Sequence, residues 1–195
     1  MADDFNKPAP QTLDLLLSRR SGSAKTMTGP GPNPAELREI LAAGARVPDH
    51  GKLAPWRFIL FEGDARARFG ELLVEVLKAS EPDANEVRIE MERGRFLRAP
   101  IVVGVVSRVV ENPKAPEWEQ VLSAGAACQT MLIAAHSMGY VGNWLTEWYG
   151  FDRRVLERLG LAANERIAGF LYFGQPSAPL EERPRPNLDS LITRF

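Results

Sequence analysis

The residues best suited to chemistry gather between Arg46 and Trp56, where the chain reads R-V-P-D-H-G-K-L-A-P-W. A guanidinium, a carboxylate, an imidazole, an ammonium group and an indole occur within this one segment. Pro48, Gly51 and Pro55 break it into a loop. A loop does not need this polar chemistry in order to turn, and loops between buried elements often carry binding residues. The segment is therefore predicted to contribute to a functional site.

A second polar group, Arg19-Arg20-Ser21, follows a short apolar helical pattern and precedes a Gly- and Pro-rich segment, residues 22–34, that is expected to be a loop. Two interpretations compete for it. Cations are favoured at the solvated C-terminal end of a helix by the helix dipole. Alternatively, two arginine forks and a hydroxyl form a clamp for a phosphate. From these residues alone, the solvated helix end is the better supported interpretation.

Cys128 and His136 fall in a long apolar pattern that predicts a buried helix over residues 117–138. Cys128 follows the small residues S-A-G-A-A and has no identifiable general base, so it is expected to be a small buried hydrophobe. The small residues allow either close approach of a flat ring or backbone, or simply tight helix packing. His136 stands near the helix C-terminus, where a structural or dipole role fits better. One cysteine and two histidines cannot complete a Cys/His zinc site or a disulfide framework, and no metal site is predicted.

Several mechanism motifs are missing from the sequence. It has no Walker phosphate loop, no G-x-S-x-G elbow and no H-E-x-x-H pair. No Gly-rich turn opening a helix follows the β-branched run Ile101–Val106, so a Rossmann dinucleotide site is not expected. Any chemistry is then expected to belong to an organic cofactor.

Helices and strands alternate along the chain in a pattern that predicts an α/β or α+β layer fold. A capping box, with Asn33 as N-cap, Pro34 at the first helical position and Glu36 three residues after the cap, predicts a helix that ends at Val47. Thr12 is predicted to cap the first short helix. The expected strands are 57–62, 101–106, 140–146 and 167–174, and the other expected helices start at Asp64, 83, 117 and 152. The charged helix over 83–97 suits a solvated surface or a mobile lid better than a site.

The composition is that of a globular protein with one core. The chain has 195 residues, 45% hydrophobic and 25% charged, with a net charge of −1. We expect one domain over residues 1–195, with residues 1–10 as a loose tail. No basic run indicates nucleic acid, no apolar segment reaches the ~20 residues of a membrane span, and the acidic start does not resemble a signal peptide. A cytoplasmic location is expected.

The order of these motifs resembles the nitroreductase family of flavoproteins, in particular its small bacterial YdjA-like branch. The matching pieces span nearly the whole chain. They are R-R-S at 19–21, R-V-P-D-H-G-K-L-A-P-W-R-F at 46–58, W-E-Q-V-L-S-A-G-A at 118–126, N-W-L-T at 143–146, and G-F-L-Y-F-G-Q-P at 169–176 with R-P-R-P at 183–186.

The resemblance implies an α+β fold in which helices flank a central, mostly antiparallel sheet and a long central helix lies at a homodimer interface. Two FMN molecules would lie at that interface. Hydride would pass from NADPH or NADH through FMN to a small-molecule acceptor such as a nitroaromatic or a quinone. Because FMN carries the chemistry, no catalytic side chain is expected.

The resemblance also assigns binding residues. FMN would be held by Arg19, Arg20 and Ser21 of one chain, by Arg46 and His50 of the partner chain, and by the tryptophan motif Trp144, Leu145 and Thr146. A nicotinamide dinucleotide would bind the end of the long helix, namely Ala134, Ala135, His136, Ser137, Met138 and Gly139. The loop from Arg46 to Trp56 would then be half of a site, with Asp49 forming its turn and Trp56 anchoring it to the core.

One departure from the family pattern concerns Glu147. Relatives often read Trp-Arg-Thr/Ser-Gly, whereas this chain reads Trp144-Leu145-Thr146-Glu147. An apolar side chain replaces a cation and a carboxylate replaces a glycine, which affects substrate and nicotinamide preference. A non-catalytic flavin-binding or storage protein is therefore an alternative. A purely structural protein that dimerises through the long helix is a third hypothesis.

Overall fold

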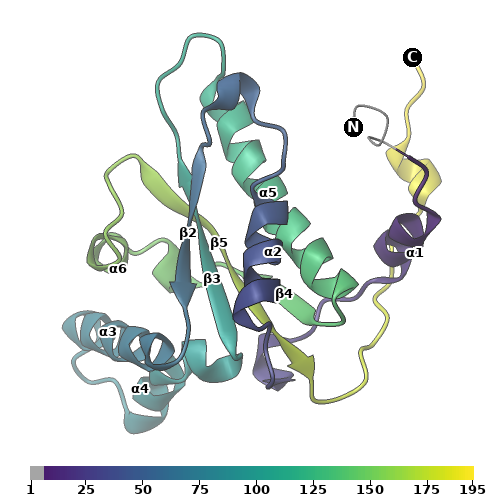
Figure 1. The fold of residues 1–195 in the computed structure, drawn as a ribbon. Coiled ribbons are helices and arrows are strands. Elements are labelled where there is room, and N and C mark those ends of the chain that lie inside the picture. The colour runs from purple at the N-terminus through teal and green to yellow at the C-terminus, as the bar shows by residue number, and fades with distance from the viewer. Residues whose placement is uncertain (1–6) are drawn as a thin grey trace.

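The structure is a computed structural model that describes residues 7–195 (Figure 1). At its centre lies a five-stranded sheet in which every pairing is antiparallel. The strands β2 (Trp56–Phe61), β3 (Ile101–Arg108) and β5 (Glu165–Pro176) are adjacent, and both β4 (Val141–Leu145) and β1 (Met27–Thr28) pair with β5. The predicted α+β class with a mostly antiparallel sheet is confirmed.

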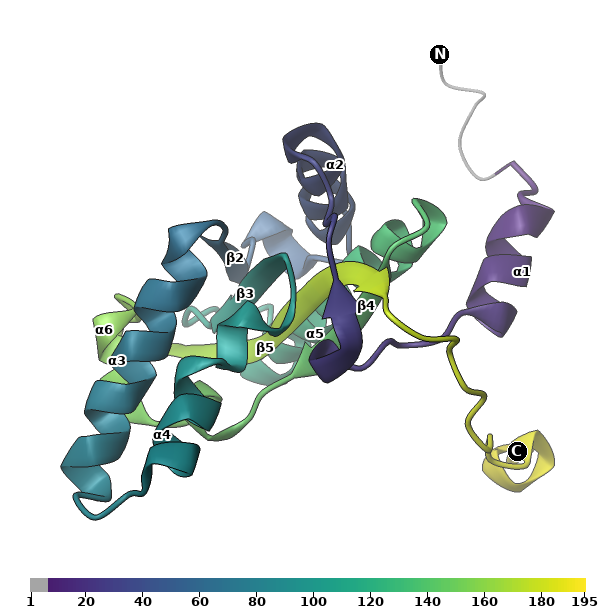
Figure 2. The same cartoon turned by 90° about the horizontal axis from the view of Figure 1, so that it is seen from below.

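The two faces of the sheet carry separate cores because helices cover both (Figures 1 and 2). On one face, α2 (Pro34–Gly44) and α5 (Glu117–Ser137) pack over the sheet. On the other lie α3 (Asp64–Ser80), α4 (Glu86–Arg93) and α6 (Arg153–Arg158), around an aromatic cluster that includes Phe61, Phe69, Phe96, Tyr149, Phe170 and Tyr172. The buried run Ile101–Ser107 of β3 confirms the prediction of a central covered strand. No helix in the described range 7–195 is both long and apolar enough to cross a bilayer.

Two segments project away from this body. The helix α1 (Pro10–Ser18) contains no buried residue, although Leu13, Leu16 and Leu17 are on it. The C-terminal tail with its short 3₁₀ turn Leu188–Leu191 is also exposed, and both views show it and α1 extending from the same side of the molecule (Figures 1 and 2). These leucines therefore form an exposed apolar surface on α1.

Local signals predicted most element ends correctly. The capping box is present, since the Asn33 side chain accepts from the backbone of Glu36 and the Glu36 side chain accepts from the backbone of Asn33. Gly139 and Gly160 end their helices with φ of 86° and 74°, in the left-handed region that glycine favours. The long helix begins and ends within one residue of its predicted bounds.

Three expectations were wrong. The N-cap of α1 is Ala9 rather than Thr12, because Pro10 already occupies the first helical turn. Residues 7–9 precede α1 without regular structure, and residues 1–6 of the expected tail lie outside the described range. The helix α2 ends at Gly44 and not at Val47. The Gly- and Pro-rich segment is not loop throughout, since β1 pairs with β5 within it.

The helix α4 exposes Glu86, Val87, Glu90 and Met91, as expected for a solvated surface, but it also carries a buried carboxylate. Glu92 is fully buried. The reason is a set of partners that satisfies its carboxylate: Arg88, Arg95, and the indole of Trp148, whose Nε1 donates over 2.7 Å.

Candidate functional site

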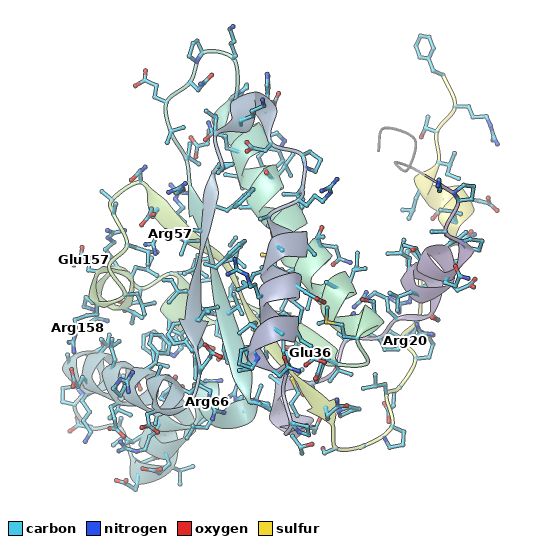
Figure 3. All side chains as sticks on the ribbon, viewed as in Figure 1. Arg20, Glu36, Arg57, Arg66, Glu157 and Arg158 are labelled. Carbon is cyan, nitrogen blue, oxygen red and sulfur yellow. The ribbon has the colours of Figure 1, made fainter. Side chains whose placement is uncertain are left out.

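Three arginines form a cluster at the C-terminal end of α1. The Arg19 Nη2 donates to Ser21 Oγ over 3.0 Å and its Nε donates to His136 Nδ1 over 3.3 Å. Arg20 donates to the backbone oxygens of Ser18 and Arg19 and forms an ion pair with Glu182. Figure 3 shows Arg20 beside the base of α1. The structure therefore brings the predicted Arg19, Arg20 and Ser21 together at one place.

The third guanidinium comes from the C-terminal tail. Arg185 Nη2 lies 3.2 Å from Glu182 Oε1, and burial, Arg185 and Arg20 together lower the pKa of Arg19. Arginine stays charged in proteins, so three positive charges here face the single carboxylate of Glu182. This excess of positive charge is what a phosphate ester would neutralise, and it favours the phosphate-clamp interpretation over the solvated helix end.

Sequence reasoning missed Arg185 and Glu182 as site residues. The R-P-R-P motif was visible, and its prolines correctly indicated an extended tail. Nothing in the local pattern shows that this tail returns to Arg19, because that contact joins residues far apart in the chain.

The segment between Arg46 and Trp56 is an ordered turn built on Asp49. The two carboxylate oxygens of Asp49 accept from the backbone N–H of Leu53 over 3.0 Å and of Ala54 over 2.9 Å. Gly51, Lys52 and Ala54 have φ of 76°, 56° and 45°. Non-glycine residues in this region cost about 1–3 kcal/mol each, and such strain persists where surrounding contacts impose it. The prediction that Asp49 forms the turn is confirmed.

Trp56 and Ser123 fasten this loop to the long helix. Trp56 Nε1 donates to Ser123 Oγ over 3.0 Å, and Ser123 Oγ donates to the carbonyl of Pro48 over 2.6 Å. The indole is thus used in anchoring, as predicted, and the loop is held in one position against α5.

His50 and Arg46 remain available to a ligand. His50 Nδ1 lies 2.7 Å from Glu119 Oε2, and both side chains are about half exposed. Arg46 is exposed, and its side chain makes no hydrogen bond or ion pair within residues 7–195. A groove of about 310 Å³ beside them is lined by Pro48, His50, Glu119, Leu122, Ser123 and Ala126.

Within one chain, this loop and the arginine cluster are far apart. His50 meets α5 at Glu119, near the N-terminal end, whereas Arg19 meets it at His136, near the C-terminal end (Figure 1). At a rise of ~1.5 Å per residue these two contact points are about 26 Å apart along the helix axis. A single chain therefore does not place Arg46 and His50 around a ligand held by Arg19.

The tryptophan motif lies at the end of β4. Trp144 is 39% exposed, and its Nε1 donates to the carbonyl of Ala168 over 3.0 Å. The indole lies directly on Gly169, where a Cβ would come within 2.0 Å of the indole nitrogen, and it approaches the small residue Gly125 of α5. Leu145 packs on the aromatic core and Thr146 is half-buried. The motif thus offers one partly exposed flat ring beside the sheet.

Glu147 follows this motif with φ of 50° and ψ of 179°, a conformation that glycine adopts far more easily. Its carboxylate forms ion pairs with Arg95 Nη1 at 2.6 Å and Arg98 Nη1 at 2.9 Å. The backbone at Glu147 therefore follows a path that suits glycine, and two arginines hold the Glu147 side chain.

The stretch predicted to bind nicotinamide dinucleotide does not form one surface. Ala135 lies on the core-facing side of α5 and is fully buried. Ala134 and Met138 are partly buried against the same core. Ser137 and Gly139 are exposed, whereas His136 is half-buried against Arg19. The assignment of the stretch to the dinucleotide remains a prediction. No group of three or more His, Cys, Asp or Glu side chains in residues 7–195 is arranged to hold a metal ion.

Comparison with known proteins agrees with this geometry. The family model described as the nitroreductase family matches residues 16–175. The chain is 38% identical over 164 residues to YdjA of Escherichia coli strain K12, named as an NAD(P)H nitroreductase, covering 84% of this chain and 87% of YdjA. A protein of Haemophilus influenzae with the same type of name is 33% identical over 163 residues, which are 83% of this chain and 86% of that protein.

Solved structures share the fold. A nitroreductase-like family protein from Bacillus cereus has a TM-score of 0.80 at 21% identity, covering 97% of this chain and 98% of that one. A nitroreductase from Desulfovibrio desulfuricans, solved in complex with FMN, has a TM-score of 0.72 at 24% identity with the same coverage. With the family model matching most of the chain and the sheet and helices arranged as in these structures, the protein belongs to the nitroreductase family, a family of oxidoreductases.

Proposed function

We propose that the protein is an FMN-dependent oxidoreductase that passes hydride from NADPH or NADH to a nitroaromatic, a quinone or a similarly electron-poor acceptor. The observation that carries the proposal is the arginine cluster of Arg19, Arg20 and Arg185, whose charge Glu182 only partly balances. Two further findings support the same assignment. The names of the E. coli and H. influenzae relatives include NAD(P)H, and the D. desulfuricans protein was solved in complex with FMN.

The residues present fit FMN. Its phosphate carries nearly two negative charges, and arginine forks with the Ser21 hydroxyl are a suitable set of donors. FMN, when bound, supplies the hydride-accepting and hydride-donating ring. The partly exposed indole of Trp144, fixed on Gly169, provides a flat apolar surface near that ring's expected place. Hydride transfer requires proximity and exclusion of water rather than an acid–base pair, which agrees with the absence of a catalytic dyad in the sequence motifs.

We infer further that the working unit is a homodimer. The exposed stripe of α5 contains Trp118, Val121 and Leu122, followed by the small, partly exposed Gly125 and Ala126. A two-fold axis near the middle of this helix would place the N-terminal end of one α5 beside the C-terminal end of the other. Arg46 and His50 of one protomer would then approach the flavin held by the arginine cluster of the other. The unpacked α1 and C-terminal tail would find their covering surface in the same assembly.

A non-catalytic flavin-binding protein is the alternative, and it depends on Glu147 in place of the family's glycine. The glycine-type backbone at Glu147 and its pairing with Arg95 and Arg98 favour the enzyme, because the chain here follows a path that a glycine could also adopt. Turnover of an acceptor with either nicotinamide separates the two possibilities.

The proposal is tested by FMN affinity. Arg19→Ala and Arg185→Ala are each expected to weaken FMN binding at least tenfold, since a charge-assisted hydrogen bond contributes roughly 1.5–3 kcal/mol. Arg183→Ala is the matched control, because Arg183 lies in the same tail and its side chain has no hydrogen bond or ion pair within the described residues. FMN affinity is measured by quenching of FMN fluorescence. Affinities of Arg19→Ala and Arg185→Ala that equal the affinity of the Arg183→Ala control would refute the phosphate site.

A further inference from the structure

His136 has a contact that its expected role in dinucleotide binding does not explain. Its Nδ1 accepts a hydrogen bond from Arg19 Nε over 3.3 Å, so the imidazole belongs to the arginine cluster. Arg19 also donates from Nη2 to Ser21 Oγ. A guanidinium has five N–H donors, and these two contacts leave three for a ligand.

The ring is neutral at physiological pH. Burial, followed by the charge of Arg19, lowers the pKa of His136 to about 4, and the nearby carbonyls of Arg20 and Leu132 only partly oppose this. Because Nδ1 accepts, the proton resides on Nε2. The charged group in contact with the ring is Arg19, and Arg20, Arg185 and Glu182 belong to the cluster around Arg19.

Neutrality matters for what the cluster can bind. A carboxylate in this place would orient Arg19 but would also cancel charge and compete with a phosphate. A protonated imidazole would add a fourth cation and repel Arg19. A neutral imidazole orients the guanidinium and leaves its charge for the ligand.

The second ring nitrogen is also relevant. His136 Nε2 is buried and makes no hydrogen bond of good geometry within residues 7–195, although the carbonyls of Arg20 and Leu132 lie near the ring. An unsatisfied buried donor costs roughly 1–3 kcal/mol, and such groups are expected where a ligand or ordered water completes the site.

We propose that His136 is a positioning residue of the FMN phosphate subsite, where it fixes the Arg19 guanidinium, rather than a contact for the nicotinamide dinucleotide. This assignment rests on the proposed function. Riboflavin is the matched ligand for testing it, because it carries the same ring and ribityl chain as FMN but lacks the phosphate.

The experiment compares dissociation constants for FMN and riboflavin. His136→Leu, which removes the acceptor at similar volume, should weaken FMN roughly tenfold and riboflavin less than twofold. His136→Asn places an oxygen near the position of Nδ1 and should restore most of the FMN affinity. An equal loss for both flavins, or a raised KM for NADPH or NADH with unchanged FMN affinity, would overturn the proposal. Failure of the unaltered protein to bind FMN would instead refute the proposed function.

A measurement on the unaltered protein removes any dependence on the folding of the variants. The chain has only two histidines, so the ring nitrogens of His136 are readily assigned by NMR. In the FMN-free protein, the neutral Nε2–H form is expected throughout pH 8 to 5.5. Protonation within that range, or an Nδ1–H tautomer, would contradict the proposal.

Discussion

At the scale of single residues, Glu147 combines backbone strain with two ion pairs. Its φ of 50° costs a non-glycine residue about 1–3 kcal/mol, which the pairs with Arg95 and Arg98 offset. Glu147→Ala keeps the strain and loses the pairs, whereas Glu147→Gly loses both. The glycine variant is therefore expected to be more stable than the alanine variant by at least about 1 kcal/mol in urea unfolding. An alanine variant of equal or greater stability would show that the backbone there is unstrained.

Sequence reasoning succeeded for residues whose roles are local. Asp49 was predicted to form its turn because Pro48 and Gly51 surround it, and the structure shows both carboxylate oxygens used in this way. It failed for Arg185, because the tail that carries Arg185 meets the cluster through the ion pair of Glu182 with Arg20, which lies almost a whole chain length away. It also gave no sign that Glu92 would be buried, since burial depends on Trp148 approaching from another element.

At the scale of elements, an ion pair links the adjacent strands β2, β3 and β5 at one end. Arg57 on β2 reaches across β3 to Glu165, the first residue of β5, with Nε and Nη2 each 2.7 Å from a carboxylate oxygen. Glu165 Oε2 also accepts from the backbone N–H of Ala162 over 3.0 Å. The side chain is buried, and its hydrogen bonds with Arg57 lower the pKa of Glu165 from its ordinary value of 4.5 to about 2.

This pair predicts acid sensitivity. A carboxyl with a depressed folded-state pKa stabilises the fold fully above about pH 4.5, and that contribution is lost as pH falls toward 2. Glu165→Gln is expected to cost about 3 kcal/mol at pH 7 and to flatten the loss of stability between pH 5 and 3. Urea unfolding of both proteins at several pH values tests this. An unchanged pH dependence in the glutamine variant would assign the acid sensitivity to other groups.

Elements with a strong internal pattern were predictable, and those defined by long-range pairing were not. The β-branched run of β3 and the apolar helix α5 appeared at nearly their predicted positions. The two-residue strand β1 exists only because Met27 and Thr28 pair with the distant end of β5. The helix α1 buries no residue, so the start of the helix could not be predicted from residues that face the core.

At the scale of the whole molecule, the proposed site requires two chains. Leu122 is 52% exposed on the stripe of α5, so Leu122→Glu should produce a monomer that has lost FMN affinity. Val87→Glu is the control, because Val87 is 81% exposed on α4, which covers the opposite face of the sheet. It should remain dimeric and bind FMN as the unaltered protein does. Light scattering during gel filtration gives the mass, and a monomeric variant saturated with FMN would contradict the shared site.

The most direct test of the account is an anaerobic titration of the purified, FMN-loaded protein with NADPH and with NADH. The protein is expected to be yellow, and about one equivalent of at least one nicotinamide should bleach its visible absorbance. The absorbance should return when a quinone or nitroaromatic is added. A colourless protein that takes up no added FMN, or a yellow one that neither nicotinamide bleaches, would contradict it.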